Sequence, residues 1–109
     1  MSKTINLTYE GKTYTLEFTR KSVERMEATG FDVSELGTKP MSTLPLLWKG
    51  SFLAHHKNVK EYLINKMFEQ IRGKEELFDK LADMYVDTVE SLFDEPENDE
   101  GNLEWEANW

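Results

Sequence analysis

The chain of 109 residues contains no cysteine. Disulfides, thiolate metal sites and cysteine nucleophiles are therefore excluded, and this absence is typical of proteins from a reducing compartment. The sequence also lacks any run of the roughly 18 apolar residues that a membrane span requires, and its first residues lack the apolar stretch of a secretory signal. We therefore expect a cytoplasmic protein with no membrane partner.

Basic residues are missing from the end of the chain. Residues 94–109 hold seven of the 21 acidic residues and none of the 13 basic ones, which leaves 14 acids and 13 bases in residues 1–93. A nearly neutral body without clustered Lys and Arg disfavours binding to a phosphate backbone, so no nucleic-acid partner is expected. Polar, like-charged residues after Pro96 predict that residues 94–109 form a flexible, disordered acidic tail.

Residues 1–93 have the length and composition of one folded domain. The chain is 39% hydrophobic and 31% charged, which predicts a packed core. Residues 4–18 are predicted to form a two-stranded β-hairpin, because apolar and polar side chains alternate on both sides of Glu10-Gly11. A two-residue turn there pairs Leu7 with Tyr14 and places the apolar side chains on one face. Such a hairpin is marginal alone, so this face is expected to cover helices.

Apolar residues recur at helical spacing along the rest of the domain. Four helices are expected, at about residues 20–29, 43–55, 59–72 and 74–93. Thr19 is a suitable N-cap for the first, and Gly30 suits the left-handed position that closes it, with Phe31 packing back on Met26. The predicted fold class is therefore α+β, a hairpin packed on a mainly helical body of about four helices, with the acidic tail outside.

The next helices carry their own start and stop signals. Ser42 or Thr43 can cap the second helix, and Asn58 followed by Glu61 is typical of a capping box at the third. Gly73 is expected to end the third helix. The second helix has little polar surface, which predicts that it is central and buried. The large aromatic residues on apolar helical faces, Trp48 and Tyr85, are predicted to lie in the core.

No set of residues points to catalysis. Serines and threonines are plentiful, but none has a histidine and an aspartate in a suitable local arrangement, and no glycine-rich phosphate loop or metal motif is present. His55 and His56 are adjacent, and neighbouring helix positions point about 100° apart, so the pair cannot easily chelate one metal. We expect no catalytic residue, no cofactor and no metal, so the protein is predicted not to be an enzyme.

Two groups of residues are candidates for binding another protein. The first is a row of acids four residues apart on the last helix, formed by Glu75, Asp79 and Asp83. This row is either a solvated face or a stripe that contacts a partner. The second is a set of apolar residues within the acidic tail, formed by Leu103, Trp105 and Trp109. These residues dock in a partner groove, fold back onto the domain or have no role.

Three stretches of the chain resemble a known family. They are Tyr14-Thr-Leu-Glu-Phe-Thr-Arg-Lys-Ser-Val continuing to Phe31-Asp32, then Pro45-Leu-Leu-Trp-Lys-Gly-Ser-Phe-Leu-Ala-His-His56, and the terminal Gly101-Asn102 with Trp105. Together they are similar to the tail assembly chaperones, small proteins encoded among the tail genes of tailed bacteriophages and prophages of Gram-positive bacteria. The resemblance spans nearly the whole chain and rests on structural residues rather than on a catalytic signature.

The resemblance implies a non-catalytic factor that works in the cytoplasm of the bacterial host and is absent from the mature virion. Such chaperones hold the long, apolar tape measure protein soluble and help tail-tube subunits polymerise around it. The tape measure protein is therefore the expected partner, with the tail tube protein as a second one, and a homo-oligomer is left open.

Other roles would leave different signs. An acidic inhibitor that mimics nucleic acid and acts on a host protein would need its acids arrayed over a folded surface. A minor structural component of the head-tail junction would be found in purified particles. A small hydrolase would need a pocketed pair of groups with perturbed pKa values, which nothing in the sequence marks.

Overall fold

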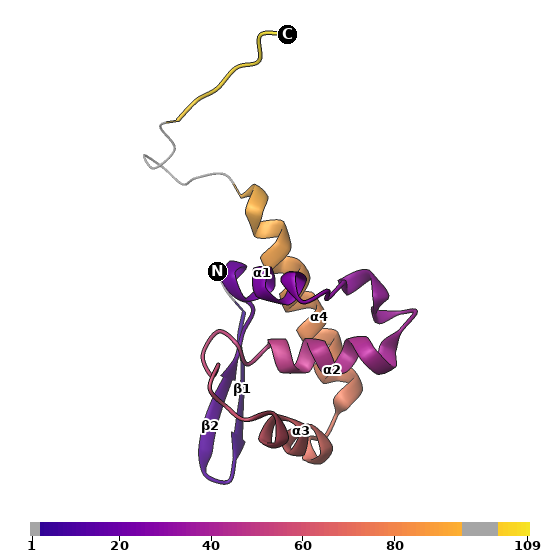
Figure 1. Ribbon diagram of the computed structural model, residues 1–109. Helices are drawn as coiled ribbons and strands as arrows, with labels where there is room; N and C mark the ends of the chain where they lie inside the picture. The colour runs from indigo at the N-terminus through magenta and orange to yellow at the C-terminus, as the bar shows by residue number, and fades with distance from the viewer. Residues whose placement is uncertain (1–2, 95–102) are drawn as a thin grey trace.

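The computed structural model describes residues 3–94 and 103–109 of the chain. Within these ranges it has the predicted α+β architecture, a two-stranded antiparallel hairpin beside four α-helices (Figure 1). The strands are β1 (Ile5–Tyr9) and β2 (Lys12–Leu16), and the helices are α1 (Arg20–Ala28), α2 (Pro40–Gly50), α3 (Glu61–Gln70) and α4 (Lys74–Glu90). Two short 3-10 helices, η1 (Val33–Leu36) and η2 (Ser91–Phe93), complete the described part.

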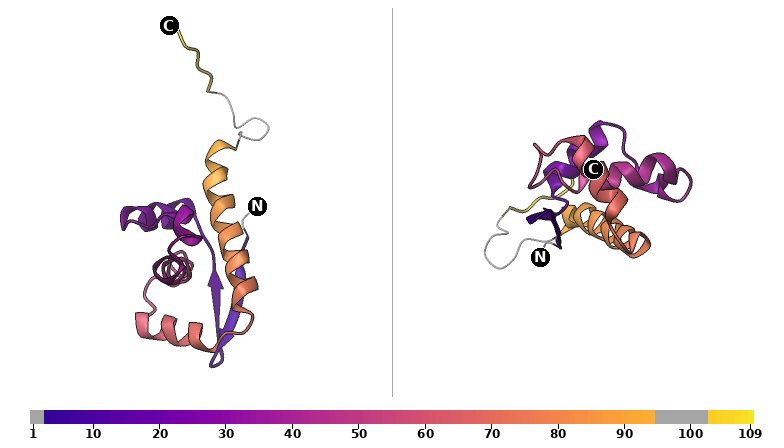
Figure 2. Two further views of the ribbon diagram at one scale, coloured as in Figure 1. Left: turned by 90° about the vertical axis from the view of Figure 1, so that its right-hand side faces the viewer. Right: turned by 90° about the horizontal axis from the view of Figure 1, so that it is seen from below.

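The elements form two sides of one body. Figure 2 (left) shows α1, α2 and α3 stacked on one side, with the hairpin and α4 running along the other. The core lies between the two sides, where Leu16, Leu47 and Leu81 are completely buried. No helix of the described residues is long and apolar enough to cross a bilayer.

The hairpin has the predicted register. Leu7 pairs with Tyr14 and Ile5 with Leu16, as a two-residue turn requires. The turn residues Glu10 and Gly11 have φ of 50° and 80°, the left-handed pair of a type I′ turn, which matches the twist of the strands. Tyr14 is buried, whereas its partner Leu7 is only partly buried, so β2 is the strand that faces the core.

Helix α1 begins and ends as its sequence predicts. The Thr19 hydroxyl accepts a hydrogen bond from the Ser22 amide, and the Ser22 hydroxyl accepts one from the Thr19 amide. At the other end, Gly30 has φ of 98°, its amide donates to the Glu27 carbonyl, and the Phe31 amide donates to the Met26 carbonyl at 3.1 Å. These two bonds define the Schellman motif, and Phe31 and Met26 are both buried.

Helix α2 is displaced from its predicted position. It spans Pro40–Gly50 rather than 43–55, because proline is favoured at the first helical position, and Thr43 is buried inside the helix instead of capping it. The helix stops early because Ser51 turns toward the hairpin. Its hydroxyl donates to the Trp48 carbonyl at 2.6 Å, and its carbonyl accepts the Glu17 amide at 3.0 Å.

Helix α3 is shorter than predicted, spanning Glu61–Gln70 rather than 59–72. Its N-cap is Lys60, which makes no side-chain capping bond, so the predicted capping box at Asn58 is wrong. Gly73 was expected to end α3, yet it has φ of 68° and is the N-cap of α4. The helical pattern predicted for 74–93 is divided between α4 and the 3-10 helix η2.

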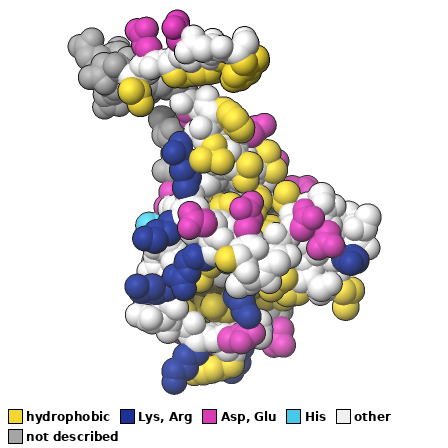
Figure 3. All heavy atoms as spheres, turned by 45° about the horizontal axis from the view of Figure 1, so that its top comes forward, with side chains coloured by type: hydrophobic (Ala, Val, Ile, Leu, Met, Phe, Trp, Pro, Cys, Tyr) yellow, Lys and Arg dark blue, Asp and Glu magenta, His cyan; other side chains and the backbone are white. Residues whose placement is uncertain are grey.

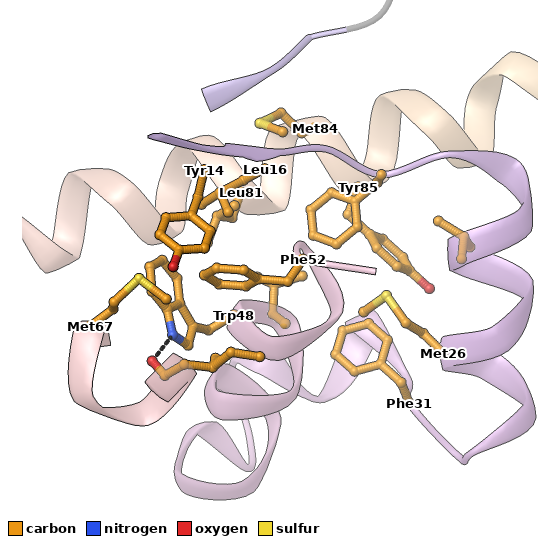
Figure 4. Close-up of a cluster of buried hydrophobic side chains, with 14 residues drawn as sticks. Tyr14, Leu16, Met26, Phe31, Trp48, Phe52, Met67, Leu81, Met84 and Tyr85 are labelled. Carbon is orange, nitrogen blue, oxygen red and sulfur yellow. Dashed lines mark hydrogen bonds between the residues drawn. The ribbon is translucent and has the colours of Figure 1, made fainter. Parts of the chain in front are cut away.

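Aromatic side chains dominate the core (Figure 4). Trp48 and Tyr85 are 1% and 2% exposed, which confirms their predicted place. The Trp48 indole N–H donates to the Ile64 carbonyl at 2.9 Å, so its polar atom is satisfied and α2 is tied to α3. Edge-to-face contacts of Tyr85 with Phe18 and Phe31, at 5.4 and 5.1 Å, join α4 to the segments on either side of α1.

Candidate functional site

The C-terminal end of α4 carries exposed apolar side chains. Val86, Leu92 and Phe93 are 41%, 63% and 85% exposed, and we call these three residues the α4-end patch. Figure 1 shows this end of α4 running past α1, where the rest of the body no longer covers it. The helix predicted from apolar spacing over residues 74–93 included Leu92 and Phe93, but the body does not extend far enough along α4 and η2 to cover these two side chains.

A hydrogen bond holds the end of α4 in place. The Arg20 guanidinium donates to the Ser91 carbonyl at 2.6 Å, which links the start of α1 to η2. The Thr88 hydroxyl donates to the Phe18 carbonyl at 2.9 Å one turn earlier. These bonds orient the α4-end patch with respect to the domain. In Figure 3 hydrophobic side chains gather at this end of the molecule, with acidic side chains beside them.

The predicted acidic row is present on the outer side of α4. Glu75, Asp79 and Asp83 are all exposed, and their spacing of four places them along one side of the helix. Asp79 lies seven residues, or two turns, before Val86, so the row runs beside the α4-end patch. Asp87 continues it and pairs with Lys3 at 2.5 Å, and this contact raises the pKa of Lys3 above its usual value.

The candidate residues near the C-terminus are exposed. Leu103, Trp105 and Trp109 are 92%, 85% and 104% exposed, in a segment without regular secondary structure. In this structure the three side chains are not packed on the domain. The flexible tail was predicted for residues 94–109, and residues 95–102 of it lie outside the described residues. The structure does not bring this segment together with the acidic row of α4.

The two histidines connect the hairpin to the segment after α2, which the sequence did not reveal. The Thr15 amide, on the free edge of β2, donates to His56 Nε2 at 2.9 Å. The imidazole must therefore present an unprotonated Nε2. Burial, aided by the charges of His55 and Lys12, lowers the pKa of His56 and favours this neutral form. His55 Nε2 lies 2.6 Å from Glu17 Oε1.

Two cavities differ in their chemistry. The larger, of about 630 Å³, lies between the hairpin and the segment before α3, and its charged lining includes Lys12, Lys57 and Lys60. The smaller, of about 300 Å³, lies between α1 and α2, and its lining is mainly apolar with Arg25 and Lys49 beside it. Figure 3 shows that Lys and Arg side chains gather along one side of the molecule. The near-neutral body therefore has a basic region on this side, with acidic side chains next to it on the same face.

A metal centre has no support from the described ranges, where no three His, Asp or Glu side chains are grouped to hold an ion.

The chain belongs to the family described as Domain of unknown function (DUF5055), whose model matches residues 1–109. Comparison with curated proteins and with solved structures gives no match.

Proposed function

We propose that this member of the DUF5055 family is a non-catalytic tail assembly chaperone of a tailed phage or prophage. It binds apolar helical segments of the tape measure protein, keeps them soluble and assists assembly of the tail tube around them. The observation that carries this proposal is the α4-end patch, which exposes large apolar side chains on a fixed helix end. The resemblance of three sequence stretches to such chaperones supports the phage setting.

The surface favours a particular kind of client segment. Val86 lies on α4 and Phe93 lies seven residues further along the chain, in η2, so a client helix can place its apolar side chains along this stretch. The acidic row beside the patch attracts Lys and Arg on the flanks of that helix and repels acidic ones. The expected client is therefore an apolar helix bordered by basic residues.

The patch alone gives weak binding. Burying a Val, Leu or Phe side chain contributes roughly 1.5–3 kcal/mol, and these three are already partly buried, so the sum is on the order of 5 kcal/mol. Micromolar affinity corresponds to about 8 kcal/mol. Further contacts are therefore needed. The candidates for them are Leu103, Trp105 and Trp109 of the C-terminal segment, which recruits or regulates a second partner. A tethered second contact raises the overall affinity through its effective concentration.

The test is co-expression with the long helical protein encoded beside this one among the tail genes. The soluble yield of that protein is compared for the wild type, Phe93→Asp and the control Met41→Asp. Met41 is 90% exposed and lies at the start of α2, so the control makes the same chemical change away from the patch. We expect Phe93→Asp to lose most of the soluble client and Met41→Asp to retain it. A wild type that neither binds nor solubilises the client would refute the proposal.

A further inference from the structure

The small cavity between α1 and α2 has the features of a socket for an aromatic side chain. Its walls and rim include Arg25, Met26, Phe31, Leu46, Lys49 and Leu53. Met26 and Phe31 are buried and form part of its wall, as Figure 4 shows them side by side, whereas Leu46 is 41% exposed at its edge. The volume of about 300 Å³ is that of a small ligand site.

The rim of this socket is basic. Arg25 and Lys49 both line it, and the adjoining cavity adds Lys21 and Lys57. Lys49 pairs with Glu61 at 2.7 Å, whereas Arg25 has no ion pair to any described residue. Arg25 therefore retains its five donors for an acidic group that approaches the socket. A ligand with an aromatic group and flanking carboxylates matches both the apolar wall and the charged rim.

The chain itself contains such a ligand. Trp105 stands between Glu104 and Glu106, within residues 94–109 that hold seven acids and no base. Trp105 is 85% exposed, and residues 103–109 extend away from the body in Figure 1 and in the left view of Figure 2. An exposed indole that extends away from its own body is placed to reach a neighbouring molecule.

We propose that the socket between α1 and α2 binds the C-terminal segment, residues 103–109, of a second copy of this chain. The Trp105 indole enters the socket against Met26 and Phe31, where thioether and edge-to-face aromatic contacts are favourable. The carboxylates of Glu104 and Glu106 face Arg25. Reciprocal exchange of the two segments gives a closed, symmetric dimer. The inference goes beyond the proposed function and does not depend on the identity of the client.

The larger cavity is the less suitable of the two for this segment. Its charges attract acids, but its lining mixes apolar residues such as Tyr14 and Leu63 with Lys12, Lys57 and Lys60, so it is less apolar than the small socket. An aromatic anchor gains most of its binding free energy from desolvation in a well-packed pocket, and carboxylate contacts on an open surface contribute little. The small socket combines both kinds of contact, so we assign the segment to it.

The test uses full-length chains in sedimentation equilibrium over a wide concentration range. We expect the wild type to dimerise, and Trp105→Ala or Leu46→Glu to weaken dimerisation at least roughly tenfold. Trp109→Ala, which removes the tryptophan without acidic neighbours on both sides, should change it less than about threefold. Leu46 and Trp105 are outside the core, so both variants should fold, which circular dichroism checks. Arg25→Glu replaces Leu46→Glu if that variant is unfolded.

A mixing experiment separates exchange between copies from docking within one chain. Trp105→Ala has an intact socket and Leu46→Glu an intact segment, so the two should form a one-to-one complex when mixed at a concentration where each variant alone is mainly monomeric. A wild type that stays monomeric overturns the proposal, including the case in which each segment occupies its own socket. Loss of dimerisation in Tyr62→Glu, but not in Leu46→Glu, also overturns it, because Tyr62 lines the larger cavity.

Discussion

Gly50 is the residue that allows α1 and α2 to approach each other, and replacing it by alanine tests how tightly they pack. A Cβ built on Gly50 would contact the Met26 side chain, at 2.5 Å from Sδ and 3.0 Å from Cγ, and also clash with its terminal methyl group. Both residues are buried, so Met26 has to shift. Overpacking of this kind costs about 1–3 kcal/mol.

A second effect of Gly50→Ala has the opposite sign. Gly50 is the last residue of α2 and does not have a positive φ, so alanine fits its backbone. The better helix propensity of alanine contributes about 0.5–1 kcal/mol. We therefore expect the substitution to lower the free energy of unfolding by a net 0.5–2 kcal/mol, about the difference of the two terms.

A double-mutant cycle with Met26→Ala gives the sharpest form of this prediction. Without the methionine side chain the new Cβ enters empty space, so only the propensity term remains and Gly50→Ala becomes stabilising by about 0.5–1 kcal/mol. Met26→Ala alone costs about 2–5 kcal/mol, so the cycle is measured by urea unfolding in a stabilising sulfate buffer. The buried Trp48 provides the fluorescence signal. If Gly50→Ala stabilises the protein with Met26 present, the packing argument is refuted.

Three further predictions concern single groups. Because the pKa of His56 is lowered in the folded state, the folded protein binds fewer protons than the unfolded one, so the wild type should lose stability as the pH falls below about 6.5. His56→Gln should remove this loss. A pH dependence of stability between about pH 5 and 7 that the substitution leaves unchanged would contradict the role of the neutral imidazole. Gly30→Ala should lower the free energy of unfolding by about 1–2 kcal/mol because of the φ of 98° alone, since nothing lies within 4 Å of the added Cβ. Gly37→Ala, equally unhindered but without a positive φ, is its control in thermal unfolding. Trp48→Phe should lower the free energy of unfolding by about 2 kcal/mol, roughly half from the lost hydrogen bond to the Ile64 carbonyl and half from a small cavity. Chemical denaturation measures this loss.

Features determined by neighbouring residues could be predicted from the sequence. The hairpin register follows from the parity of its apolar residues and the length of its turn. The Schellman end of α1 follows from Gly30 and the apolar pair Met26 and Phe31. In both cases the interacting groups lie within a dozen residues of one another. The spacing pattern was therefore sufficient.

Features determined by distant contacts could not be predicted. Helix α2 ends at Gly50 because the Ser51 carbonyl accepts a hydrogen bond from the Glu17 amide. The two residues are more than 30 positions apart, so no local pattern of helix-ending residues predicts this bond. The part played by His56 depends in the same way on the free edge of β2, 41 residues away. The exposure of Leu92 and Phe93 depends on where the body stops covering α4, and apolar periodicity does not contain that information.

The residues proposed to bind partners are largely separate from those that form the core. The α4-end patch and Trp105 lie on parts of the chain that contribute little to the core, whereas the buried side chains belong to the hairpin, the four helices and the turns between them. Polar substitutions at Phe93 and Trp105 should therefore leave the unfolding midpoint nearly unchanged while they remove client binding and self-association, respectively. The socket is different, because Met26 and Phe31 serve both the core and its wall. Substitutions there will alter folding and association together, so the rim residues Arg25 and Leu46 are the positions at which the two properties can be distinguished.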